Sequence, residues 1–326
     1  MNVARLLLFV CMVLCLPFNA EAHSLRTGYL EITETGNGIM DAVWKAPSLE
    51  GRTINMSPEF PEDCEITVKA AQSVPAGGQI ETWQLVCERS LLGREIAFHN
   101  LGPTQADILI RSSFAGTPAQ TFRATASNPV ISFAANSHSG SVFTTYFILG
   151  VEHILLGIDH LLFVLCLIFL IQGFRKLALT ITSFTLAHSL TLAATTMGIV
   201  QLPIRPIEAI IAFSIVLLAV EVILSQRDEI PRFSQRMPWI IAFTFGLLHG
   251  FGFASALQEI GLPDEAIPAS LLAFNLGVEA GQLAFVGTML IVLTLFRRVG
   301  WQRPVQIAAT YSTGIIATKW LIERMF

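Results

Sequence analysis

Six apolar stretches, each long enough to cross a bilayer as a helix, dominate the later part of the chain. They cover residues 143–171, 177–198, 204–225, 238–258, 268–295 and 304–322. A transmembrane helix needs about 20 mostly apolar residues, and charged residues make up only 13% of this sequence. We therefore predict an α-helical polytopic membrane domain with six transmembrane helices over 143–326, with the lipid bilayer as its solvent.

The first 22 residues have the pattern of a signal peptide. Arg5 precedes a long apolar run, and Ala20 and Ala22 form the small-residue pattern of a cleavage site. Cleavage after Ala22 would make His23 the mature N-terminus. Its imidazole and the new α-amine would together offer two nitrogens to a metal ion, so His23 is a candidate for extracytoplasmic metal capture. The alternative is a terminal residue without that role.

Short alternating runs broken by glycine, proline and asparagine occupy residues 23–137. The runs lie at 29–32, 39–44, 65–68, 83–86, 95–98, 107–110 and 130–133. Strands at such spacing are typical of a small antiparallel sandwich, and Asn37-Gly38 is a hairpin signal. We predict a small β-sandwich-like extracytoplasmic domain over 23–137, joined to the helices by a linker over 138–142.

Two cysteines, Cys64 and Cys87, fall within this exported segment. An oxidising compartment favours a disulfide between them. The alternative is two buried free thiols.

The positions of the basic residues predict how the helices cross the membrane. An exported N-terminal domain makes the first helix run inward, which places the loops at 175–176, 227–236 and 297–303 in the cytoplasm. These loops hold most of the loop lysines and arginines, as the positive-inside rule requires. We predict a multi-pass protein of a bacterial-type inner (plasma) membrane, with the N-terminal domain and the C-terminus extracytoplasmic. The scattered basic residues leave no footprint for nucleic acid.

Ionisable and amide side chains lie near the middle of four predicted helices. In the first helix, seven residues separate Glu152 from Asp159 and His153 from His160, so we expect each pair to stack along one side. The other polar residues are His188 and Ser189 in the second helix, His249 in the fourth, and Asn275, Glu279 and Gln282 on one stripe of the fifth.

These groups are expensive in lipid, since a charge at the bilayer centre costs about 2.5–3.5 kcal/mol even on a lenient scale. They must therefore pair with one another, with water or with a bound ion. Imidazole with carboxylate suits a divalent transition metal such as Ni, Co, Zn or Cu better than Mg or Ca. The predicted metal ligands are His153, Asp159, His160, His188, His249 and Glu279.

Five further residues are predicted to support the site or to line a pathway: Glu152, Asn275, Gln282, Ser189 and Glu208. Each prediction has an alternative. A single membrane histidine is often only an interhelical hydrogen-bonding group, and Glu208 near a helix end can extend to the interface.

The pattern leaves three classes of function open. The first is a secondary permease with a midplane metal site reached by alternating access, with protons as the coupling or competing ion. The second is an intramembrane zinc hydrolase that uses the same histidines and a carboxylate base. The third is a b-type haem electron carrier with paired histidine ligands.

The same motifs resemble those of the HupE/UreJ family, specifically the branch with an N-terminal exported domain. The resemblance rests on His153-x5-Asp159-His160-Leu-Leu-Phe, Phe184-Thr-Leu-Ala-His188-Ser-Leu-Thr-Leu, Phe245-Gly-Leu-Leu-His249-Gly-Phe-Gly-Phe and Phe274-Asn-Leu-Gly-Val-Glu279-Ala-Gly-Gln282. It implies a nickel or cobalt permease associated with hydrogenase, urease or cobalamin metabolism, in which Ni or Co is the substrate.

Overall fold

The computed structural model describes residues 27–36, 38–49, 52–54, 56–73, 79–104, 106–117, 119–133, 142–200, 202–226, 232–260 and 267–326. The predicted signal peptide, His23 and residues 138–141 of the predicted linker lie outside these ranges. The chain forms two compact units, one that carries the strands and one that is helical.

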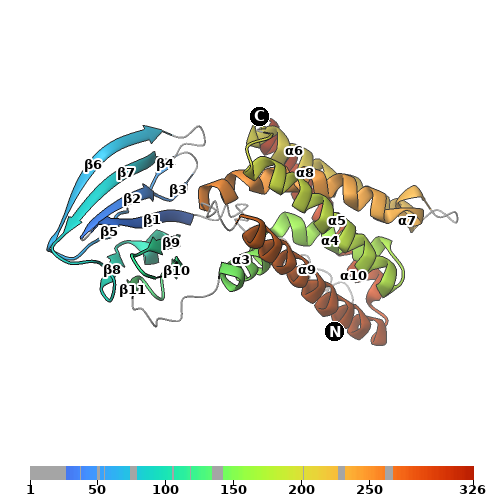
Figure 1. The fold of residues 1–326 in the computed structure, drawn as a ribbon. Helices are drawn as coiled ribbons and strands as arrows, with labels where there is room; N and C mark the ends of the chain where they lie inside the picture. The colour runs from blue at the N-terminus through green and yellow to red at the C-terminus, as the bar shows by residue number, and fades with distance from the viewer. Residues whose placement is uncertain are drawn as a thin grey trace. The chain divides into compact units, whose positions relative to one another are not determined.

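Eleven strands and one short helix make up the described residues 27–133 of the strand-bearing unit (Figure 1). The strands are β1 (Thr27–Gly36), β2 (Ile39–Lys45), β3 (Ser48–Leu49), β4 (Arg52–Thr53), β5 (Pro58–Glu59), β6 (Cys64–Ser73), β7 (Gln79–Cys87), β8 (Glu95–Phe98), β9 (Asp107–Ser113), β10 (Gln120–Ala124) and β11 (Val130–Ser132). The short helix is α2 (Leu101–Thr104). All seven predicted runs coincide with strands of this unit.

The strands form a six-stranded sheet in the order β10-β9-β1-β2-β7-β6, a three-stranded sheet β11-β8-β5 and the pair β3-β4. The hairpin predicted between the first two runs is present, since β1 and β2 pair antiparallel and Gly38 adopts a φ of 74°. Asn37 lies outside the described residues. One pairing differs from the prediction, because β1 and β9 run parallel. The short-range turn signals could not reveal it, since β9 follows β1 by many residues.

The two larger sheets share one hydrophobic core. Trp44 on β2 stacks against Phe98 on β8, with ring centroids 6.2 Å apart, and also contacts Trp83 on β7. A disulfide joins Cys64 to Cys87 across β6 and β7, whose Cα atoms are direct partners. The six-stranded sheet is thus linked covalently near the ends of these two strands.

An ion pair ties the turn before β6 to the segment before β8. The Arg94 guanidinium donates to both carboxylate oxygens of Asp63. This hydrogen bond holds the pKa of Asp63 below its ordinary value of 3.8. The pair is four-fifths buried on both sides, so it fixes two loops that the strand ladders do not join.

The helices that follow the strands build the helical unit, except for residues 142–148, 255–260 and 267–273, which group with the strand-bearing unit (Figure 1). They are α3 (Val142–Leu156), α4 (Ile158–Leu170), α5 (Phe174–Thr196), α6 (Ile204–Ser225), α7 (Phe233–Arg236), α8 (Pro238–Ile260), α9 (Ile267–Arg298) and α10 (Gln302–Met325).

Within the described residues, three helices are long and apolar enough to cross a membrane, namely α5, α6 and α9. The bent pair α3 and α4 adds a fourth if it is counted as one span. The protein is thus a multi-pass membrane protein, but six spans are not confirmed. The described apolar part of α8, Pro238–Gly252, is short, and α10 carries glutamine, threonine and charged residues that lower its hydropathy.

The first predicted span is not one straight helix. Its two arms, Phe143–Leu156 and Ile158–Leu170, are bent by 71° at Gly157. The prediction that Glu152 stacks on Asp159 and His153 on His160 along one helix is therefore wrong. Glycine leaves the helical conformation at little cost, and Asp159 places a negative charge in the first turn of α4, where the helix dipole favours it.

Helices α5 and α8 touch through their backbones. A Cβ at Gly250 would lie 2.4 Å from the His188 carbonyl oxygen, and one at Gly246 would lie 2.4 Å from that of Phe184. Real Cβ atoms do not approach so closely. The glycine-rich run of α8 therefore serves close helix packing, and it brings α8 against the turn of α5 that carries His188.

Candidate metal centre

The bend at Gly157 brings two histidines together. His153 belongs to the last turn of α3 and His160 to the first turn of α4, and their ring centroids lie 4.8 Å apart. Seven residues along a straight helix would separate them by about 10 Å. The bend thus converts a stacked pair into a contact pair.

His188 on α5 completes a group of three. One ring nitrogen from each of His153, His160 and His188 lies within 4.8 Å of the other two. Their residues are 8%, 5% and 0% exposed. Nitrogen ligands bind a metal ion at about 2.1 Å and so lie at most about 4.2 Å apart. Side-chain shifts of under about an ångström would therefore let all three hold one ion.

Asp159 acts on His160 in this structure. Its Oδ1 lies 2.9 Å from Nδ1 of His160, which leaves Nε2 as the nitrogen that His160 can offer to a ligand. A carboxylate behind an imidazole in this way fixes the tautomer and ring orientation of a metal-binding histidine. Asp159 thus supports the His160 ring in this structure, and its role as a direct metal ligand stays a prediction.

Several ring nitrogens are buried without a hydrogen-bond partner among the described residues. They include Nε2 of His160, Nε2 of His188 and Nδ1 of His249. Buried polar atoms are nearly always hydrogen-bonded, because an unpaired one loses its solvation without compensation. Three such nitrogens in one cluster suit a ligand that accepts lone pairs, and a transition-metal cation is such a ligand.

His249 on α8 is adjacent to the three-histidine group but does not belong to it. Its ring centroid lies 4.9 Å from that of His160, and the residue is 1% exposed. Its Nε2 faces the Ser214 hydroxyl of α6 at 3.5 Å. His249 therefore lies in the same buried cluster, with one ring nitrogen directed at a different helix.

The polar stripe of α9 faces α5. Asn275 Oδ1 lies 3.4 Å from Nδ1 of His188, and the Thr185 hydroxyl donates to Oε1 of Gln282 at 3.0 Å. Glu279 accepts a hydrogen bond from Thr182. Asn275 thus contacts the histidine group directly, whereas Glu279 is not a member of that group and bonds to a neighbouring hydroxyl.

Three other predicted residues are not members of the histidine group either. Glu152 is half-buried on α3, and the Ser189 hydroxyl donates to the Thr185 carbonyl of its own helix at 2.7 Å. Glu208 lies 3.8 Å from the Arg324 guanidinium, which also donates to the Glu208 carbonyl. Ser189 and Glu208 therefore have local structural partners.

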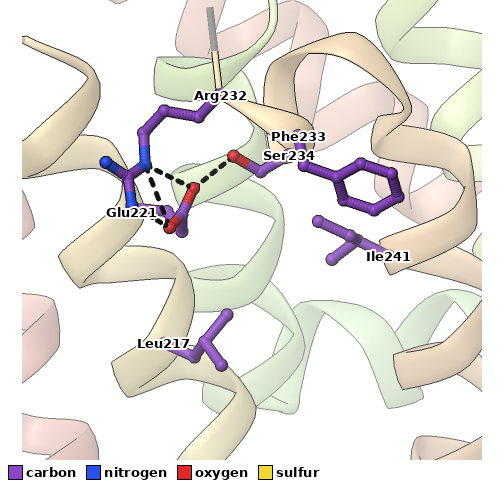
Figure 2. A pocket seen from close by; sticks show the side chains of 6 residues that line it. All are labelled: Leu217, Glu221, Arg232, Phe233, Ser234 and Ile241. Atoms are coloured by element: carbon purple, nitrogen blue, oxygen red, sulfur yellow. Dashed lines mark hydrogen bonds and ion pairs between the residues drawn. The ribbon is translucent and has the colours of Figure 1, made fainter. Parts of the chain in front are cut away.

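The carboxylate at the other end of α6 is also engaged. Glu221 accepts hydrogen bonds from Arg232 and Ser234 beside a pocket of about 320 Å³ (Figure 2). Leu217, Phe233 and Ile241 complete its lining. This network attaches α7 to the end of α6.

Sequence reasoning did not identify Ser214, Thr182 or the bend at Gly157. A hydroxyl in the middle of an apolar stretch was the available signal for Ser214, but such hydroxyls usually bond to their own helix. The Ser214 hydroxyl does so too, since it donates to the Ile211 carbonyl at 2.6 Å. Only the structure shows that it also faces His249.

Comparison with known protein families connects this helical unit to one of them. A family model described as "HupE / UreJ protein" matches residues 131–324. Searches of the curated proteins and of the solved structures found no match. The matched segment contains every member of the histidine cluster and covers more than half of the chain, so the protein belongs to the HupE/UreJ family.

Proposed function

We propose that the protein is a membrane permease for a divalent transition metal ion, with Ni or Co as the substrate. The observation that carries the proposal is the buried group of His153, His160 and His188, whose ring nitrogens lie within 4.8 Å of one another. Membership of the HupE/UreJ family supports it.

The donor set explains the choice of ion. Neutral imidazole nitrogens select borderline first-row ions and disfavour Mg and Ca. His160 and His188 supply Nε2, and Asp159 and Asn275 hold the opposite nitrogens of the two rings. Zn and Cu share these ligand preferences, so they are competing ions in any assay.

The position of the group supports transport by alternating access. Permease sites commonly form where transmembrane helices are discontinuous, and His153 and His160 flank such a break at Gly157. A histidine binds metal only when neutral, so protons compete with the ion and are the natural coupling partner. The strand-bearing unit and the C-terminus lie outside a bacterial-type inner membrane in this proposal.

The test combines metal binding with metal uptake. The detergent-purified protein is titrated with Ni, Co, Zn and Cu, and proteoliposomes are assayed for uptake of the ions that bind. We expect weak, exchangeable Ni or Co binding that is lost in His188→Ala. The control is His99→Gln, because His99 is an exposed histidine of the strand-bearing unit. Unchanged metal binding and metal uptake in a His153→Ala/His188→Ala variant would contradict the proposal.

A zinc hydrolase is the second candidate, favoured by the resemblance of three histidines and a nearby carboxylate to a catalytic zinc site. Two serines of α5 bond to backbone carbonyls in this structure, since Ser183 donates to the Trp239 carbonyl and Ser189 to that of Thr185. Tight stoichiometric zinc that survives chelation, with turnover of a lipid ester or amide, would select the hydrolase. A visible Soret band would instead indicate haem.

A further inference from the structure

A second pocket, of about 450 Å³, lies where three helices end or begin. It is lined by the C-cap residue of α6, the end of α9, the following turn and the first turns of α10: Gln226, Arg297, Gly300, Gln302, Arg303 and Gln306. Two guanidinium groups and three amides thus line one open pocket, and no acidic residue is among them. Such a donor-rich lining fits an anion.

Neither arginine is neutralised within the described part of the chain. Arg297 and Arg303 are both exposed, and no described carboxylate forms an ion pair with them. Stabilisation of its own helix explains the position of Arg297 but not that of Arg303. A cation in the last turn of α9 interacts favourably with the helix dipole, whereas a cation in the first turn of α10 does not. Arg303 therefore occupies a position that its own helix disfavours.

The location of the pocket indicates which anion it meets. Helix α9 is a candidate membrane span and ends at Arg298, so its end lies at the boundary between hydrocarbon and water. Exposed apolar side chains cover the last turns of α9, with Ile291 65% and Leu295 55% exposed. A phosphate at this depth, next to apolar helix surface, belongs to a lipid headgroup.

We propose that this pocket binds the phosphate headgroup of an anionic membrane lipid. Arg297 and Arg303 supply the charge, and the glutamine amides donate to the phosphate oxygens. Basic pockets between transmembrane helices bind anionic lipids, with about 1 kcal/mol from each basic residue near the surface. The pocket contains none of the histidines, so a test of lipid binding is independent of a test of metal transport.

The experiment is native mass spectrometry of the full-length, detergent-purified protein titrated with phosphatidylglycerol or with phosphatidylcholine. We expect retention of phosphatidylglycerol to exceed that of phosphatidylcholine at least fivefold. The variant Arg297→Gln/Arg303→Gln should weaken phosphatidylglycerol binding about thirtyfold, from the loss of two charges. Arg298→Gln is the matched control, because Arg298 ends the same helix but does not line the pocket.

Four outcomes would overturn the proposal. The wild-type protein binds both lipids equally, which needs no variant to establish. The double variant keeps its preference, or Arg298→Gln loses it to the same degree. Alternatively, millimolar inorganic phosphate displaces phosphatidylglycerol completely, which would make the ligand a soluble anion. Melting temperatures of all variants, measured in the same detergent, separate lost binding from lost folding.

Discussion

His160 and His188 differ in which residue holds the ring in place. Asp159 fixes His160 through a bond to Nδ1 at 2.9 Å, whereas Asn275 lies 3.4 Å from Nδ1 of His188. A carboxylate behind a ligand histidine commonly contributes a factor of 10 to 100 in metal affinity. We therefore expect the affinity of the proposed metal site to depend on residues that need not touch the ion.

Replacing Asp159 with asparagine should weaken Ni or Co binding about 10- to 100-fold without unfolding the protein. The amide keeps the size of the side chain but lowers the basicity of the His160 ring and weakens its orientation. Isothermal titration of the purified protein measures the change. Ser189→Ala is the control, because within the described residues the Ser189 hydroxyl bonds only to the Thr185 carbonyl. Wild-type affinity in Asp159→Asn would contradict the supporting role of this carboxylate.

The Asp63–Arg94 pair predicts how the strand-bearing unit responds to acid. Because the hydrogen bond from Arg94 lowers the pKa of Asp63 below 3.8 in the folded state, the unfolded state binds the proton more readily. The pair therefore stabilises the fold at pH above about 4, and this contribution disappears as pH falls through the lowered pKa.

Hydrogen exchange over 85–98 in the full-length protein, corrected for intrinsic rates, tests this prediction. Asp63→Asn should exchange faster than the wild type at about pH 6, and the difference should vanish at an acidic pH below the lowered pKa of Asp63, where the carboxyl is protonated in both states. Asp41→Asn, a change at an exposed position of β2, should have no effect at either pH. An equal difference between wild type and Asp63→Asn at both pH values would refute the electrostatic explanation.

Much of this residue-level description could be predicted from the sequence. Histidine in an apolar helix is conspicuous, so the cluster of His153, His160 and His188 was expected, and the disulfide partners followed from the exported segment. The contact of Asp159 with His160 could not be predicted, because spacing on a straight helix places Asp159 on Glu152. Only the bend places its carboxylate on the neighbouring imidazole.

At the scale of secondary-structure elements, alternation and turn residues identified the strands, and apolar length identified the helices. The break between α3 and α4 was hidden, because a single glycine inside an apolar run usually remains helical. The parallel pairing of β1 with β9 was hidden for another reason, since it joins strands far apart in the sequence. Six spans remain a prediction, because only α5, α6, α9 and the bent pair α3 and α4 are long and apolar enough to cross a membrane within the described residues.

The contact between α5 and α8 makes a prediction at this scale. Gly250→Ala places a Cβ 2.4 Å from the His188 carbonyl oxygen, so the two helices must separate. Overpacking of this kind costs about 1–3 kcal/mol, and thermal unfolding in detergent should show a lower melting temperature. Gly287→Ala on α9 is the matched control, because nothing lies within 4 Å of its added Cβ. Its melting temperature should stay constant or rise, since alanine favours helix. Equal behaviour of the two variants would contradict the close packing.

At the scale of the whole molecule, the distribution of charge predicts the orientation in the membrane. The loops at 175–176, 227–236 and 297–303 carry the basic residues that the positive-inside rule keeps in the cytoplasm. The pocket lined by Arg297 and Arg303 would then face the cytoplasmic leaflet.

Cysteine labelling in intact cells tests this orientation. Gly300→Cys, in the turn between α9 and α10, should react with a membrane-permeant maleimide and resist an impermeant one. Asp41→Cys on the strand-bearing unit should react with both once the outer barrier is opened. The native Cys166 is buried and serves as the background. Labelling of residue 300 by the impermeant reagent would reverse the predicted topology.

The close approach of α5 and α8 has a consequence for genetic screens of this protein. In a saturation library scored by metal-dependent growth, Gly246 and Gly250 should be as intolerant as the histidines, because any side chain there collides with a backbone carbonyl. Loss of growth alone would thus rank packing positions together with ligands. A second selection, for the amount of folded protein in the membrane, would separate the two classes, since only the ligand variants should accumulate normally.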